Sequence, residues 1–244
     1  MTKQETRPLV EICFTPHDFE LYAGQYEIAV VIDVLRATSA ICAGIHNGVE
    51  KIIPVSTIEE AQAYKAQGYL CGAERNGQIV DGFDFGNSPF AFMEPHMTGR
   101  TIVLTTTNGT RAINIASKVP TVVIGSLLNL DCLSQWLIAQ GKPTIMLCSG
   151  WKDKFNLEDT ICAGALVDAM LASGRFRAEE DSTIAAKFIF RSAKQNIFAF
   201  LKASSHRRRL RKLNLNRDVD FCLTPNTRPV IPLLQQGELV KMKL

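Results

Sequence analysis

Apolar runs alternate with helical patterns along most of this chain. Short apolar runs typical of buried strands occur at 28–35, 51–55, 69–73, 101–105, 121–124 and 144–148. Between them, the spacing of apolar residues and the end signals predict helices over 38–47, 57–67, 110–117, 127–140 and 157–173. This rhythm predicts an α/β fold with a mostly parallel or mixed sheet and helices on both faces.

Two segments depart from the alternation. Residues 74–99 are rich in Gly, Asn, Pro and Asp and are predicted to form a long loop of the kind that carries function. The chain is therefore expected to be one domain over 1–244, or two subdomains with a boundary near 90–100. After Gly174 one long helix is predicted over 182–203, followed by a basic segment and a strand-like tail.

The bulk composition narrows the class of protein. No run approaches the roughly 18 apolar residues that span a bilayer, and the N-terminal segment lacks the apolar core of a signal peptide. We therefore expect a cytoplasmic protein with no membrane partner. Seven cysteines, an odd number without C-x-x-C spacing, argue against a disulfide framework or a zinc cluster.

Positive charge is concentrated in one segment. The net charge is only +3, but residues 182–217 hold ten Lys and Arg and no acidic residue. The segment is either a solvated helix face or a surface for an anionic partner. Nucleic-acid binding is the alternative function, although no aromatic residues interleave with the Arg cluster and no nucleic-acid-binding module is present.

The first strand-to-helix junction carries charge. Open α/β sheets bind ligands beyond the carboxyl ends of their strands, so such junctions are the expected site of chemistry. Asp33 and Arg36 lie at the end of a buried strand there, and a buried charge needs a partner. Thr38 or Ser39 is expected to cap the next helix. For Arg36, a structural ion pair with an acid such as Glu74 is the competing interpretation.

Three further segments carry polar clusters. The segment 105–110 (TTTNGT) is either an ordinary Asn-Gly turn or a hydroxyl-rich cradle for phosphate. Glu158 and Asp159 lie in the first turn of a helix, where they either favour the helix dipole or coordinate a hard cation such as Mg²⁺. The long loop contributes Glu74, Arg75 and further polar residues.

Several motifs of other enzyme classes are missing or weak. The sequence contains no P-loop and no Rossmann glycine fingerprint. Cys222 and Arg228 have the Cys-x5-Arg spacing of thiol phosphatases. However, Pro225 removes a backbone donor from that loop and no glycine relaxes it, so a cysteine nucleophile is not favoured.

The polar segments together resemble the 2-phosphosulfolactate phosphatase family. The matching stretches are VVIDVLRATSAI (30–41), GAERNGQIVDGFDFGNSP (72–89), TTNGTRA (106–112) and CSGWKDKFNLEDTICAG (148–164), with the Arg-rich segment near His206 and Asp218 to Cys222. The resemblance implies a fold of two related α/β parts. It also implies a Mg²⁺-dependent phosphatase that converts 2-phosphosulfolactate to sulfolactate, a step in coenzyme M biosynthesis.

These patterns assign candidate roles around a small, multiply anionic phosphorylated substrate. The candidate catalytic residues are Asp33, Arg36, Glu74, Arg75, Asp84 and His206, and His206 or Asp84 would protonate the leaving alkoxide. The candidate substrate-binding residues are Thr38, Ser39, Asn87, Ser88, Thr106, Asn108, Gly109 and Thr110. The candidate Mg²⁺ ligands are Asp33, Glu158 and Asp159. Whether water or Asp33 attacks phosphorus stays open, and a homodimer is a further expectation.

Overall fold

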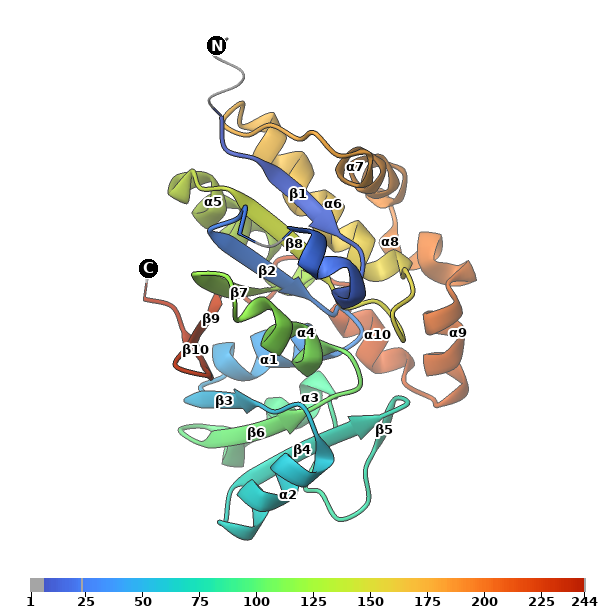
Figure 1. The fold of residues 1–244 in the computed structure, drawn as a ribbon. Coiled ribbons are helices and arrows are strands. Elements are labelled where there is room, and N and C mark those ends of the chain that lie inside the picture. The colour runs from blue at the N-terminus through green and yellow to red at the C-terminus, as the bar shows by residue number, and fades with distance from the viewer. Residues whose placement is uncertain (1–6, 23, 244) are drawn as a thin grey trace.

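One mixed sheet runs through the molecule. The computed structural model describes residues 7–22 and 24–243, and within them ten strands pair in the order β1-β8-β2-β7-β9-β10-β3-β6-β4-β5 (Figure 1). The strands are β1 (Val10–Cys13), β2 (Ile28–Ile32), β3 (Lys51–Pro54), β4 (Leu70–Arg75), β5 (Gln78–Ile79), β6 (Thr101–Thr105), β7 (Thr121–Gly125), β8 (Thr144–Cys148), β9 (Pro232–Gln235) and β10 (Glu238–Lys241).

The sheet consists of two parallel sets joined by a hairpin. β1, β8, β2 and β7 are mutually parallel, as are β3, β6 and β4. The C-terminal hairpin β9–β10 lies between them and pairs antiparallel with β7 on one side and β3 on the other (Figure 1). The last strands of the chain therefore connect two sheet regions that the earlier strands form separately.

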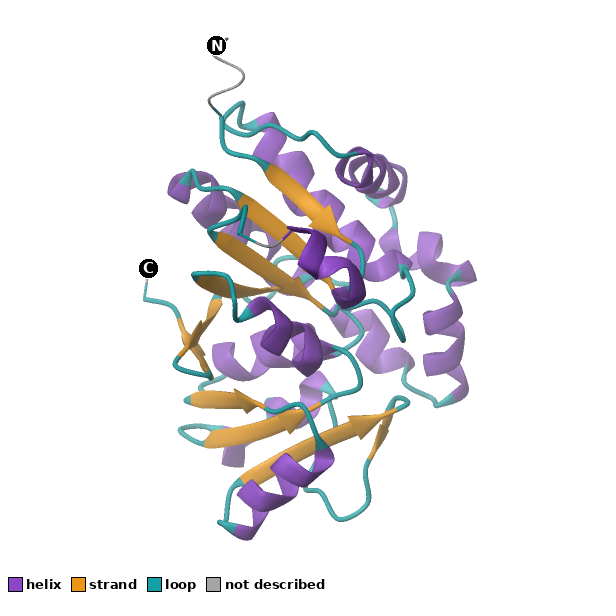
Figure 2. Ribbon diagram, viewed as in Figure 1, coloured by secondary structure: helices purple, strands orange, loops and turns teal. Residues whose placement is uncertain are grey.

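Helices cover both faces of the sheet, as predicted (Figure 2). The α-helices are α1 (Ala37–His46), α2 (Ile58–Ala66), α3 (Pro89–Phe92), α4 (Gly109–Ala116), α5 (Leu130–Gln140), α6 (Leu157–Ala172), α7 (Asp181–Ala193), α8 (Ile197–Phe200), α9 (Ser205–Lys212) and α10 (Asn216–Cys222). Short 3₁₀ helices are η1 (Pro16–Tyr22), η2 (Pro95–Met97), η3 (Leu127–Asn129) and η4 (Leu201–Ala203).

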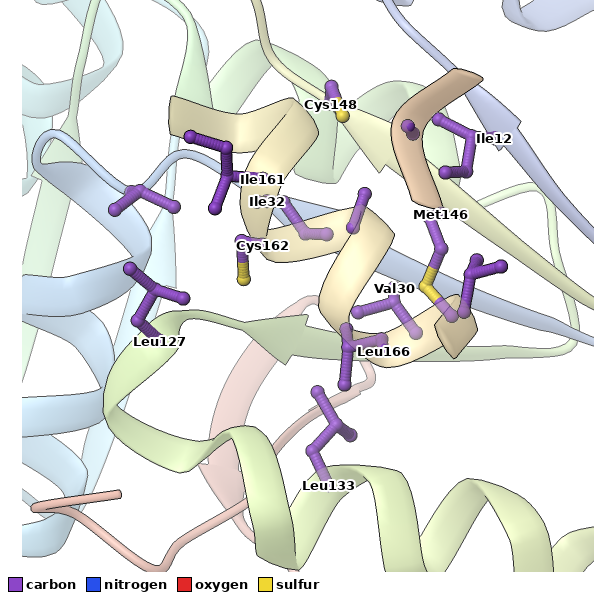
Figure 3. Packing of buried hydrophobic residues seen from close by; sticks show 14 of the residues in the cluster. Ile12, Val30, Ile32, Leu127, Leu133, Met146, Cys148, Ile161, Cys162 and Leu166 are labelled. Carbon is purple, nitrogen blue, oxygen red and sulfur yellow. The ribbon is translucent and has the colours of Figure 1, made fainter. Parts of the chain in front are cut away.

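The central strand β2 separates two hydrophobic cores. Side chains alternate across a strand, and in β2 both faces are buried. Val30 and Ile32 pack in one cluster with Ile161 and Leu166 of α6 (Figure 3). Val31 packs in the other cluster, which includes residues of α1 and α4. An uninterrupted apolar run at β2 is thus what a two-sided burial requires.

The structure corrects three sequence predictions of local structure and shows one strand for which no prediction was made. The strand predicted over 28–35 ends at Ile32, because the next residues turn toward α1. The loop predicted over 74–99 contains β5, α3 and η2. The helix predicted over 182–203 breaks after α7, where the Asn196 side chain accepts the Ala199 N–H and starts α8. β1 was not predicted.

Strands on both sides of residues 90–100 belong to the same part of the sheet. β6 follows these residues and pairs with β3 and β4, which precede them. A division into subdomains at 90–100 stays a prediction, as does the relatedness of two α/β parts. In the described residues, no helix is long and apolar enough to cross a membrane. All seven cysteines are free thiols in the structure.

The close packing of α6 against α7 leads to a prediction about stability. A Cβ on Gly164 of α6 would overlap the Ala186 carbonyl of α7 and lie 2.7 Å from its carbon atom. In an unhindered helix, Gly→Ala stabilises by about 0.5–1 kcal/mol. Here we expect Gly164→Ala to destabilise the protein by about 1–3 kcal/mol, because α7 must move. Urea unfolding measures the change, and a gain in stability would contradict the packing.

Candidate active site

A pocket forms where residues that end or follow β2, β4, β6 and β8 meet α9. Its wall combines acidic, amide, basic and aromatic side chains from segments far apart in the sequence. The lining residues are Asp33, Leu35, Arg36, Glu74, Asn76, Gly77, Asn87, Asn108, Trp151, His206, Arg209, Leu210 and Leu213. The position agrees with the expectation that ligands bind beyond the carboxyl ends of the strands.

The turn after β2 places Asp33 in this pocket. The Asp33 N–H donates to Thr38 Oγ1 at 3.0 Å, and the Thr38 N–H donates to the Asp33 carbonyl at 2.9 Å. Ser39 Oγ donates to the Val34 carbonyl at 2.8 Å. Thr38 and Ser39 are fully buried, so their hydroxyls shape the turn and do not line the pocket. The following peptide bond, between Leu35 and Arg36, is cis.

The turn after β6 has a similar arrangement. The Thr106 N–H donates to Thr110 Oγ1, and the Thr110 N–H donates to Thr106 Oγ1, both at 3.1 Å. These two hydroxyls are buried inside the turn. A Cβ on Gly109 would lie 2.6 Å from Ala37 Cβ and 2.8 Å from Asp33 Oδ2. Glycine is therefore required at position 109 because the two turns approach each other closely.

Asp159 lies behind Asp33 and binds three backbone and side-chain donors. Its Oδ1 accepts the Val34 N–H at 2.8 Å. Its Oδ2 accepts the Gly150 N–H at 3.2 Å and the Asn156 Nδ2 at 2.9 Å. Asn156 also caps α6 through the Asp159 N–H. One carboxylate thus fixes the end of β2, the loop after β8 and the start of α6 relative to one another.

The two aspartates lie in an environment that opposes ionisation. Burial is the main cause that raises the pKa of Asp33, and the charge of Asp159 adds to it. Burial also raises the pKa of Asp159, followed by the charge of Glu158. A buried carboxylate with a raised pKa at a pocket wall is typical of a functional site, because either a proton or a cation stabilises it.

Glu158 faces a different partner. His206 Nδ1 lies 2.6 Å from Glu158 Oε1, and both residues are buried. The His206 ring lies 5.5 Å from the Trp151 ring, and the Arg209 guanidinium lies over the same indole at 4.3 Å. Ser204 caps α9 through the Arg207 N–H and contacts Glu158 at 3.4 Å. The pair Glu158–His206 therefore holds α9 over the pocket.

Arg36 and Glu74 both form ion pairs or hydrogen bonds with other residues of the protein. Arg36 forms a buried ion pair with Asp218 of α10 and donates to the Gly77 carbonyl at 2.9 Å. The partner is Asp218 and not Glu74. Glu74 accepts the Gly77 N–H and contacts Thr107 N and Oγ1, each at 3.3 Å. Arg36 and Glu74 therefore hold the segment at Gly77 from both sides while they line the pocket.

Other candidates lie outside this pocket. Arg75 donates to Thr105 Oγ1 at 3.0 Å, and Asp84 pairs with Lys65. Asp84 and Ser88 line a neighbouring, more apolar cavity, and Asn87 lines both. Cys222 is fully buried at the end of α10, and burial raises the pKa of its thiol to about 12. A thiol held in this state is a poor nucleophile.

The donors present fit Mg²⁺ through aspartate oxygens. Within residues 7–22 and 24–243, no three His, Cys, Asp or Glu side chains converge as a ready metal cluster. Glu158 is engaged by His206, and both oxygens of Asp159 accept hydrogen bonds. Of the expected ligand set, Asp33 is therefore the carboxylate that lines the pocket. Mg²⁺ binds through one or two carboxylates and takes its other ligands from water and phosphate. A cation there would also offset the cost of burying two negative charges.

The sequence alone did not identify Trp151, Arg209 and Asp218 as pocket or supporting residues. A signal for Arg209 was available. Positions 206, 209, 210 and 213 are spaced as one helical face, and this face of α9 and the residues after it line the pocket. Asp218 lies far from Arg36 in the sequence, and no local pattern predicts their pairing.

The raised pKa of Asp33 predicts a pH-dependent stability. In the unfolded chain the pKa of Asp33 is about 3.9, which is below its pKa in the folded protein. Between these two pKa values, the folded state binds more protons than the unfolded state. Stability therefore falls as pH rises through that window. Asp33→Asn removes this loss. With a chelator present, we expect the Tm of Asp33→Asn to rise relative to the Tm of wild type between pH 4 and pH 8, by at least about 2 °C. A constant difference would contradict the assignment.

Comparisons with known proteins identify the family of this chain. The family model described as 2-phosphosulpholactate phosphatase matches residues 13–237. A protein of Thermotoga petrophila named probable 2-phosphosulfolactate phosphatase is 39% identical over 213 residues, 87% of this chain and 91% of the relative. Proteins with the same name from Caldanaerobacter subterraneus and Clostridium acetobutylicum are 35% and 30% identical, over 85% and 95% of this chain and 88% and 99% of the relatives. Matched along most of its length in this way, the chain belongs to the 2-phosphosulfolactate phosphatase family.

Proposed function

We propose that this protein is a Mg²⁺-dependent phosphatase that hydrolyses 2-phosphosulfolactate to sulfolactate and phosphate. The observation that carries the proposal is the pocket itself, in a chain of this family. The pocket is lined by a buried carboxylate, Asp33, and by the basic residues Arg36, His206 and Arg209. Metal-assisted phosphoryl transfer needs an oxygen ligand for the cation and positive groups for the substrate's anions. The names of the relatives support the same substrate.

The acidic side of the pocket would hold the cation and the phosphoryl group. Asp33 would bind Mg²⁺ from the pocket wall, and the negative charge of the neighbouring Asp159 would add to the attraction. The cation, when bound, supplies charge neutralisation at the phosphoryl oxygens. Asn108 lines the same part of the pocket and offers an amide to those oxygens. Thr38 and Thr110 act indirectly, because their hydroxyls hold the turns that present Asp33 and Asn108.

His206 is the proposed proton donor to the leaving alkoxide. Its Nδ1 is engaged with Glu158, so Nε2 is the nitrogen that would face the substrate. Glu158 would stabilise the protonated ring, as a carboxylate does for a catalytic histidine. Asp84, the other candidate, is engaged by Lys65 and by the Cys71 N–H. The identity of the nucleophile, water or Asp33, is left open in this proposal.

The biological setting follows from the proposed substrate. Release of sulfolactate corresponds to a step of coenzyme M biosynthesis, and we propose a cytoplasmic location for it. A homodimer stays a prediction.

Nucleic-acid binding has no support as an alternative. Several charges of the basic segment 182–217 have partners within the protein. Arg191 pairs with Asp168, and Arg209 lines the pocket. Two others stack on phenylalanine rings, Arg207 on Phe198 and Arg217 on Phe90. None of the relatives reported above has a name that refers to nucleic acid.

Metal dependence is the first test of this function. Phosphate release from 2-phosphosulfolactate is expected in Mg²⁺, with a loss of at least about a hundredfold in EDTA and recovery when Mg²⁺ is restored. The matched thiol control is Cys222→Ser, which should stay within about threefold of wild type because the thiol is buried away from the pocket. Full turnover in excess EDTA, or loss of turnover in a folded Cys222→Ser variant, would rule out this mechanism.

A further inference from the structure

Three basic side chains line the pocket, and they differ in how fully they are paired with other residues. Arg36 is paired with Asp218, and His206 is bonded to Glu158. Arg209 differs from both. Its Nη2 is buried and has no hydrogen-bond partner among the residues that the structure describes. A buried guanidinium nitrogen without a partner costs free energy, so an anion that completes it would bind favourably.

Arg209 is held in place by an aromatic platform. Its guanidinium lies over the Trp151 ring at 4.3 Å. Trp151 is anchored in a tight turn, where its N–H donates to the Lys154 carbonyl at 2.8 Å. Gly150 adopts φ +61° at the start of this turn, and a Cβ there would lie 2.5 Å from the same carbonyl oxygen. Stacking on an anchored ring restricts the guanidinium to one orientation and lowers the entropy lost on binding.

Two further observations point to a missing ligand. Burial lowers the pKa of Arg209, an effect that the negative charge of Glu158 opposes, so the charge is partly desolvated. Asn87, only 5% exposed, lines the same pocket and has a buried Oδ1 without a partner within residues 7–22 and 24–243. An amide can present either oxygen or nitrogen, so Asn87 is able to contact a polar group of a bound acid.

We propose that Arg209, positioned by Trp151, binds the non-reacting sulfonate or carboxylate of the substrate, with Asn87 as an additional polar contact. The inference rests on the proposed phosphatase function and assigns the two ends of the substrate to different lining residues. Asp33 and Asn108 face the phosphoryl group, and Arg209 faces the acid group. Selectivity for phosphoesters of acids over neutral alkyl phosphates then comes from a residue outside the phosphoryl site.

Binding of sulfolactate tests this assignment without turnover. Calorimetry should show that Arg209→Gln binds sulfolactate at least about thirtyfold more weakly than wild type, as expected when a desolvated charged contact is removed. The matched control is Arg211→Gln, an exposed position on the same helix, which should bind within about twofold of wild type. Equal affinities of Arg209→Gln and wild type, or no binding of sulfolactate by wild type, would overturn the proposal.

The positioning role of Trp151 has its own readout. Trp151→Leu should weaken sulfolactate binding, and Trp151→Phe should restore most of it, because a ring face is what the guanidinium needs. If Trp151→Leu and Trp151→Phe bind equally, stacking does not position Arg209.

A kinetic comparison separates this proposal from the phosphatase function. The ratio of kcat/KM for 2-phosphosulfolactate to that for propyl phosphate should fall at least about thirtyfold in Arg209→Gln. An unchanged ratio in an active enzyme would overturn the role of Arg209 and leave the phosphatase function intact. If wild type hydrolysed neither ester, the function would fail, whereas the sulfolactate affinities would still decide the role of Arg209.

Discussion

The hydrogen bonds of the buried Asp159 carboxylate hold together the segments that build the pocket. They connect the end of β2, the loop after β8 and the N-terminus of α6. Each partner is a backbone N–H or an amide that would otherwise need another acceptor, so the carboxylate replaces several separate contacts. The same loop continues to Trp151, and the Arg209 guanidinium stacks on the Trp151 ring. A single acidic side chain thus determines the positions of both Asp33 and the basic wall.

Burial of two neighbouring aspartates costs free energy, and this cost explains why the site favours a proton or a cation. Asp33 and Asp159 are buried close to each other, and burial raises the pKa of both. Two like charges in a desolvated site are stabilised when a proton or a divalent cation joins them. In the same pocket, Arg209 is a partly desolvated cation whose buried Nη2 has no hydrogen-bond partner among the described residues. A substrate with phosphate at one end and an acid group at the other would relieve both costs at once.

Periodicity in the sequence was sufficient to predict the fold class. The buried strands and most helices follow from apolar runs and end signals. Asp33 was predicted to be a site residue because a carboxylate stands at the end of an apolar strand. The hairpin β9–β10 was predicted only as a strand-like tail, because its role depends on pairing with β7 and β3 across the chain. The split between α7 and α8 depends on one capping side chain, Asn196.

The site could be predicted only in part, for reasons that individual residues make clear. Thr38 and Thr110 were expected to bind phosphate, but a hydroxyl next to a turn bonds equally well to the backbone, as both do here. Arg36 was expected to bind substrate, and its partner Asp218 is separated from it by most of the chain. Arg209 was overlooked among neighbouring arginines, because only the packing of α9 distinguishes it.

Calorimetric titration of Mg²⁺ into the wild-type protein and into Asp33→Asn, at neutral pH, tests the central claim most directly. The matched control is Asp84→Asn, whose carboxylate is engaged by Lys65 away from the pocket. The account predicts saturable binding by wild type and by Asp84→Asn, and a loss of affinity of at least about tenfold in Asp33→Asn, because the carboxylate ligand at the pocket wall is removed. Equal Mg²⁺ affinity in wild type and Asp33→Asn would contradict it.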